Sequence, residues 1–363
     1  MNRDYNNTMD ALRFSPETKA RMAANLAAAQ EQTDPRTAPE VRAVRGGKRR
    51  WRFAAVAAAA AVLVVGVGGG AYATGALMGV GNVFDDLFGG PPAQTEVVDK
   101  IGRPLGASAT SGGVTITAEA IVGDKANYAI VFSVAKDDGT PFEGVEELET
   151  GVLLLGFADA ASVHVDGVTS AGGSSHFYDA DPADNAIQYV EQMSVTSLGD
   201  SIIGRTARVH FKDLCRYVGG SERQVIAEGT WDMKFTVDYE DTSVALPAGQ
   251  SFEMNGMEAT LDSASLSPLA LTLKYTVHEP VNWEKQENGR LSEHNSAQQD
   301  RFLEFPIAIN LKDGTTIDAS NSGGGWNADE SATACHKNCM FDEFLNLDEV
   351  ASVTIGDIEI PLP

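Results

Sequence analysis

The chain has 363 residues, 43% of them hydrophobic, and a net charge of −24, which gives room for two domains and accessory segments. The charge is split, because residues 1–52 carry eleven Lys and Arg against six acids, a net of +5, whereas the remainder carries −29. Phosphate groups would repel the acidic remainder, which argues against a nucleic-acid-binding protein, and the split indicates that the two parts meet different surroundings.

The N-terminal tail contains the start of a helix. In Ser15-Pro16-Glu17, a serine is placed to cap the helix, a proline takes the first helical position and an acid lies in the first turn. Good helix formers follow, so we expect a helix over 16–31 within a cytoplasmic tail of residues 1–52. Met22 and Leu26 share one face of it, in a stripe too thin for a folded domain. The helix is either solvated, or it folds when Met22 and Leu26 bind a cytoplasmic partner.

A run of 32 residues without charge extends from Phe53 to Phe84. About 20 apolar residues cross the hydrocarbon core of a bilayer, so we expect a transmembrane helix over 53–77, followed by a linker over 78–96. Six basic residues and no acid lie within 42–52, whereas acids follow the run. This asymmetry predicts a cytoplasmic N-terminus and an extracellular C-terminal portion in the cell membrane.

Two other interpretations of the apolar run stay open. One is a buried helix of a soluble protein, although such helices rarely lack charge over this length. The other is a signal peptide cleaved after Ala73, because Ala71-Tyr72-Ala73 has the small-x-small pattern of a cleavage site. The 52 residues before the run are more than an ordinary signal peptide carries, which favours a retained anchor.

Beyond the linker, short runs alternate apolar and polar residues with the period of a β-strand. No long segment of helical period interrupts them, and turns rich in Gly, Asp and Pro separate them. We therefore expect a mainly β chain with two tandem immunoglobulin-like β-sandwich domains, over 97–240 and 241–363. The runs lie at 114–122, 127–134, 151–157, 187–195, 207–211, 231–239, 302–311 and 350–360.

The two expected domains contain similar hairpins. Residues 113–134 align without gaps on 256–277, a shift of 143 positions, with Gly113 matching Gly256. The shift predicts equivalent strand pairs in a duplicated domain, with a polar insertion at roughly 278–301 in the second copy. Chance similarity between two hairpins is the alternative, because strand patterns recur.

The three cysteines are Cys215, which stands alone, and the close pair Cys335 and Cys339. Outside a cell, Cys335 and Cys339 could close a small disulfide loop. Two free thiols are one alternative, and a metal site that includes His336 is another, although a zinc site needs more ligands than these three. We expect Cys215 to be a small buried residue.

No set of residues indicates catalysis, a cofactor or a metal. The six histidines are scattered without HExxH spacing, and Ser174-Ser175-His176 lies in a Gly-rich stretch, expected to be a loop, that lacks a nucleophile elbow. Acids at 178–185 lack the central Gly and terminal Glu of an EF-hand loop, so we expect a solvated turn there. These observations predict a protein that is not an enzyme.

Several segments resemble a family known mainly as a domain of unknown function. They are Phe14-Ser15-Pro16-Glu17, Lys48-Arg49-Arg50, residues 113–117, Gly123-Asp124, the Asp-Gly-Thr turns at 138–140 and 313–315, Ser267-Pro268 and residues 350–357. The resemblance implies a single-pass surface protein of Gram-positive bacteria, of a kind often encoded near extracytoplasmic-function sigma factors. It further implies an anti-sigma-like role, although the tail has no His or Cys and so lacks the His-x3-Cys-x2-Cys zinc motif of one anti-sigma class.

Two functional interpretations follow. In the first, the protein is an envelope-sensing regulator whose tail binds a cytoplasmic sigma factor and whose outer domains detect an extracellular ligand. In the second, it is a surface-displayed binding or structural module with a passive anchor. The interpretations differ in whether the tail helix has a partner.

Overall fold

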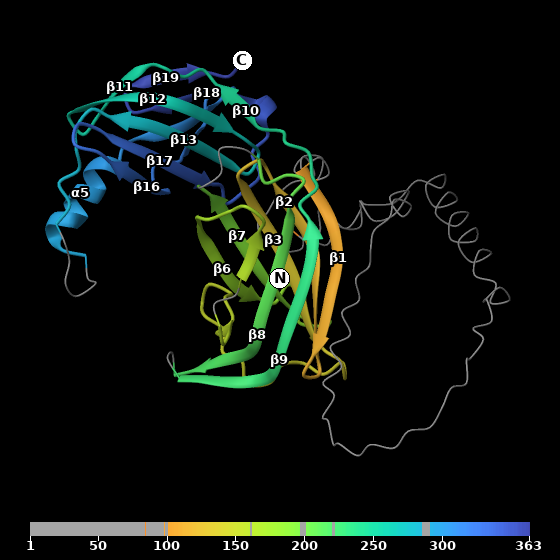
Figure 1. Ribbon diagram of the computed structural model, residues 1–363. Coiled ribbons are helices and arrows are strands. Elements are labelled where there is room, and N and C mark those ends of the chain that lie inside the picture. The colour runs from red at the N-terminus through yellow and green to blue at the C-terminus, as the bar shows by residue number, and fades with distance from the viewer. Residues whose placement is uncertain are drawn as a thin grey trace, which may run out of the picture. The chain divides into compact units, whose positions relative to one another are not determined.

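The computed structural model describes residues 84, 98, 101–159, 162–196, 201–219, 222–284 and 291–363. The predicted tail helix and membrane span lie outside these residues. Within the described ranges, no helix is long and apolar enough to cross a membrane. The described part is mainly β (Figure 1), which confirms the predicted class at that level.

The first module comprises strands β1–β9 and has two antiparallel sheets (Figure 1). One sheet has the order β1-β2-β3-β7-β6, and in the other β8 pairs with β4, β5 and β9. Side chains from both sheets share one core, in which Trp231 and Phe132 are fully buried. The strands are β1 (Gly102–Ser111), β2 (Val114–Gly123), β3 (Asn127–Lys136), β4 (Leu155–Phe157), β5 (Ser162–Val165), β6 (Ala171–Tyr178), β7 (Ile187–Val195), β8 (Thr206–Val218) and β9 (Glu222–Thr236).

The second module comprises β10–β19 and one α-helix. Its first sheet has the order β10-β12-β13-β17-β16, with β11 also paired to β12, and its second has the order β15-β14-β18-β19. A separate core lies between these sheets. The elements are β10 (Val244–Leu246), β11 (Ser251–Met254), β12 (Met257–Leu266), β13 (Ala270–Val277), α5 (Glu293–Leu303), β14 (Ile307–Leu311), β15 (Thr316–Asp318), β16 (Gly323–Ala328), β17 (Thr333–Met340), a 3-10 turn (Leu347–Glu349), β18 (Val350–Ile355) and β19 (Ile358–Pro361).

The two modules repeat one strand arrangement. In the β2–β3 pair Ala118 lies opposite Phe132, and in the β12–β13 pair Leu261 lies opposite Tyr275, which is the same register after the 143-residue shift. Both pairs have a bulge at the equivalent position, directly after Ala118 and after Leu261. The predicted equivalence of the two hairpins is therefore confirmed at the level of individual residue pairs.

Burial along β2 shows where a second apolar surface begins. It alternates from Val114 to Ala118, as expected for a strand with one face on the core, and then becomes continuous through Gly123. The continuous part is covered on its outer side by a further apolar cluster, which we call the junction cluster. Its buried members are Ala120, Val122, Ala129, Val131 and Val190 of the first module, Leu269 and Phe344 of the second, and Phe84, Val98 and Ile101 from before β1.

Equivalent turns of the two modules meet beside the junction cluster. Asp124 follows β2, and Ser267 occupies the matching place after β12. Each side chain accepts hydrogen bonds from the backbone N–H groups two and three residues further on. Ser267 Oγ also donates to Asp124 Oδ2 at 2.6 Å, and both residues are buried. The duplicated turn thus supplies both partners of one buried contact between the modules.

The polar insertion of the second copy contains helix α5, which the sequence analysis did not predict. Ser292 caps the helix, and its hydroxyl accepts a hydrogen bond from the N–H of Asn295. Only Asn295, Phe302 and Leu303 of the helix are buried. Its apolar stripe is therefore too short to produce a clear helical period.

Candidate functional site

The residues predicted to bind a partner, Met22 and Leu26, lie outside the described part of the chain. Cys335 and Cys339 are described, and both are free thiols on β17. Four steps along an extended strand separate their Cα atoms by roughly 13 Å, whereas a disulfide needs less than about 7 Å. The predicted disulfide loop is a strand in the structure, which shows the free-thiol alternative instead.

Cys335, Lys337 and Cys339 face the core of the second module, because alternate residues of β17 share a face. Lys337 is fully buried, and its Nζ donates to the carbonyl oxygens of Leu303 at 2.5 Å and Ser320 at 2.9 Å. Burial lowers the pKa of Lys337 and raises the pKa of Cys335 to about 12. Among the described residues, no group of three metal-ligating side chains occurs. We conclude that this polar stripe has a role in packing.

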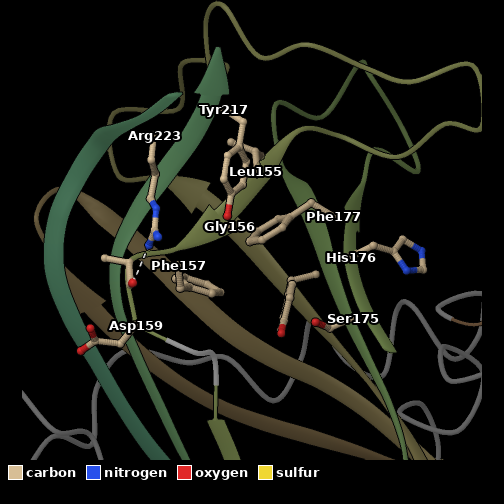
Figure 2. A pocket seen from close by; sticks show the side chains of 11 residues that line it. Leu155, Gly156, Phe157, Asp159, Ser175, His176, Phe177, Tyr217 and Arg223 are labelled. Carbon is tan, nitrogen blue, oxygen red and sulfur yellow. Dashed lines mark hydrogen bonds between the residues drawn. The ribbon is translucent and has the colours of Figure 1, made fainter. Parts of the chain in front are cut away.

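The first module has a cavity of about 360 Å³ where β4, an edge strand of one sheet, meets β6, an edge strand of the other (Figure 2). A cavity of this size suits one small ligand. Residues from β4, from the β6–β7 pair and from the β8–β9 hairpin surround it. The lining consists of Leu155, Gly156, Phe157, Ala158, Asp159, Ser175, His176, Phe177, Tyr189, Tyr217 and Arg223.

Aromatic rings form the floor of the cavity. Phe157 stacks on Phe211 with ring centroids 4.3 Å apart, and it meets Tyr189 edge-on at 5.4 Å. Phe177 lies 4.8 Å from Tyr189, also centroid to centroid. These rings are buried in the module core, so the floor is fixed by packing and needs no ligand to form it.

One side of the rim carries a guanidinium group. Tyr217 and Arg223 are cross-strand partners in the β8–β9 hairpin, so their side chains project from the same face. Arg223 Nη1 donates to the carbonyl oxygen of Ala158 at 2.5 Å, the contact dashed in Figure 2. Among the described residues, no carboxylate forms an ion pair with Arg223, since the neighbouring Asp159 pairs with Lys212 at 3.7 Å.

Hydroxyl groups lie across the cavity from Arg223. Ser175 is on that side in Figure 2, and its hydroxyl lies close enough to Tyr189 to act on the pKa of the phenol. Burial raises the pKa of Tyr189, an effect that Ser175 opposes, so this phenol stays neutral. The His176 ring points away from the floor, and partial burial lowers its pKa, so the ring is uncharged at pH 7.

A buried carboxyl lies on β7, two residues beyond Tyr189. Glu191 is 4% exposed and accepts a hydrogen bond from the Tyr128 hydroxyl at 3.3 Å. Burial raises the pKa of Glu191 to about 8, although the Tyr128 bond acts in the opposite direction. Glu191 is therefore mostly protonated at pH 7.

The sequence analysis missed this cavity for two reasons. Ser174-Ser175-His176, expected in a loop, lies within strand β6. The strand run predicted at 207–211 ends before Tyr217. A bulge at Asp213, where φ is 43°, interrupts the alternation, so that Leu214 and Cys215 are buried in succession. The pair Gly219-Gly220 is a hairpin signal that would have extended both strands to the residues of the rim.

Comparisons with known proteins cover part of the chain. Residues 47–136 match the family model described as "Domain of unknown function (DUF4179)", which supports the resemblance to a family of that kind. A solved structure described as "The crystal structure of the conserved domain protein from Bacillus anthracis" is similar with a TM-score of 0.44 and 14% identity, over 69% of this chain and 75% of that chain. No curated protein sequence matches.

Proposed function

We propose that this protein is a membrane-anchored, non-enzymatic regulator of the anti-sigma type. In this proposal, residues 53–77 cross the membrane, and the tail of residues 1–52 binds a cytoplasmic sigma factor through Met22 and Leu26. The two modules, tandem and immunoglobulin-like, sense the cell envelope from outside. The cavity of the first module receives the ligand.

The observation that carries the proposal is the packing of the segment before β1. Phe84, Val98 and Ile101 are each at most 2% exposed and belong to the junction cluster. These residues follow the predicted membrane span in the sequence, so a rearrangement of the junction would act on the part of the chain that comes directly after the anchor. A passive anchor needs only a solvated linker at this place.

The test concerns the tail. Replacing Met22 and Leu26 with Asp removes the apolar face of the predicted helix, while Ala24→Asp with Ala28→Asp adds the same charge to the opposite face. Affinity capture from cells with the full-length protein should recover a sigma factor with the wild type and with the Ala24/Ala28 control. Recovery should drop at least tenfold with the Met22/Leu26 variant.

A second candidate function is a surface-displayed binding module with a passive tail. It is favoured by the cavity, whose lining comes entirely from the first module. If the wild type and the Met22/Leu26 variant capture the same cytoplasmic proteins, or none, the regulator proposal fails and this second function stands.

A further inference from the structure

The cavity combines a floor of closely packed aromatic rings with Arg223 at its rim, which forms no ion pair with any described residue. A guanidinium group has five N–H donors, and among the described residues Arg223 donates one hydrogen bond, to the Ala158 carbonyl. That bond holds the side chain over the opening and leaves donors on the same planar group for another acceptor. Carboxylates match this geometry, because they accept two parallel N–H bonds from one guanidinium.

The local charge favours an anion despite the acidic chain. Asp159 is the acid that lines the cavity, and its partner Lys212 offsets its charge. The other lining groups with shifted pKa values, Tyr189 and His176, are neutral at pH 7. With Lys212 counted beside the lining residues, the formal charge around the rim is about +1, which attracts a carboxylate.

The rest of the cavity limits the shape of the ligand. The rings of Phe157 and Phe177 lie beneath the cavity and are at most 6% exposed, and Ser175 offers a hydroxyl on the side away from Arg223. Gly156 keeps this space open, because a Cβ there would lie 2.9 Å from the Tyr217 hydroxyl. A cavity of about 360 Å³ holds one six-membered ring with substituents and no longer chain.

We infer that the cavity binds a small ring-shaped carboxylate, a sugar acid or an aromatic acid, and that Arg223 anchors its carboxylate. The ring lies against the aromatic floor, and its far substituents meet Ser175. This inference rests on the proposed sensory role of the cavity, since it names the chemical class of the sensed ligand.

The experiment compares acids with neutral analogues of similar shape. Ligand-observed NMR titrations at pH 7 on the full-length protein in detergent micelles use D-glucuronate against D-glucose, and benzoate against benzyl alcohol. At least one acid should bind ten or more times more tightly than its analogue. Preference for glucuronate or for benzoate identifies the ligand as a sugar acid or an aromatic acid.

Two arginine variants distinguish a specific contact between Arg223 and the carboxylate of the ligand from a general effect of positive charge on the sheet. Arg223→Gln should reduce the affinity for the acid to that of the neutral analogue, and it should leave the fold unchanged because the side chain is exposed. Arg208→Gln removes another exposed arginine of the same sheet, one that pairs with Asp166 at 3.1 Å, and should leave the affinity unchanged.

The inference is overturned if neither acid binds, if acids and analogues bind equally, or if Arg223→Gln binds the acid as the wild type does. These outcomes are independent of the tail experiment. Acid binding without a captured sigma factor would refute the regulator alone, and a captured sigma factor without acid binding would refute the ligand class alone.

Discussion

Lys337 and Glu191 are both ionisable and buried, and they differ in their hydrogen-bond partners. Lys337 donates to two carbonyl oxygens, which accept hydrogen bonds from its ammonium group in the core. Glu191 accepts one long hydrogen bond from the Tyr128 hydroxyl, and this bond offsets little of the cost of burying a carboxylate. Glu191 therefore holds its proton to about pH 8.

The proton of Glu191 makes stability depend on pH. In the unfolded chain this carboxyl loses its proton near pH 4.5, whereas the folded protein keeps it to about pH 8. Folding then requires proton uptake, so the free energy of unfolding should fall as pH rises from 4.5 to 8, by on the order of 4 kcal/mol. Glu191→Gln should abolish this decrease, which urea titrations at pH 5, 6.5 and 8 would measure.

A matched control for Glu191 is Glu228→Gln, a change of an exposed glutamate on β9. This variant should follow the pH dependence of the wild type. Parallel curves for the wild type and Glu191→Gln would show that Glu191 is ionised throughout this range, contrary to the burial argument.

Among the secondary-structure elements, those whose apolar residues recur at regular intervals could be predicted. Those that contain a bulge or lack a continuous apolar stripe could not. The runs at 114–122 and 127–134 are found as strands β2 and β3, because their side chains alternate with the core on one face. The bulge at Asp213 broke this alternation and concealed the rim of the cavity. Helix α5 was concealed because its stability depends on a cap and on three buried residues, with no continuous apolar stripe.

The cap of α5 should therefore contribute measurably to stability. Ser292→Ala removes the acceptor of the Asn295 N–H and should lower the free energy of unfolding by about 1 kcal/mol. Chemical denaturation measures the change. Ser296→Ala, inside the same helix, is the control and should be neutral or slightly stabilising, because alanine has the higher helix propensity. Equal effects of the two changes would contradict a capping role.

At the scale of the whole molecule, the repeat was visible in the sequence but the contact between its copies was not. Gapless alignment over 22 positions reflects a shared register, which depends on residues close in sequence. The Asp124–Ser267 bond joins residues 143 positions apart, and nothing in the local pattern indicates that these turns meet. The cavity could not be predicted for the same reason, because the residues of its rim and floor come from strands that are distant in the chain.

The junction bond predicts a destabilised variant. Ser267→Ala removes the donor to Asp124 and the acceptor of two backbone N–H groups, all buried, and should lower the free energy of unfolding by about 2 kcal/mol. Denaturant titration of the full-length protein measures this. Ser263→Ala, an exposed position on β12, should change it by less than about 0.5 kcal/mol. A Ser267 variant as stable as this control would show that the bond contributes nothing.

The difference between Asp124 and Ser267 bears on which modules can pair with one another through this turn. Two identical ancestral modules in contact through this turn would have faced each other with the same side chain, and two carboxylates at that distance repel. With Asp in one copy and Ser in the other, the turn of the first module bonds to the second module and disfavours another first module. Divergence at one position after duplication thus makes the two turns complementary, so that the turn of each module pairs with the other kind of module and not with a copy of itself.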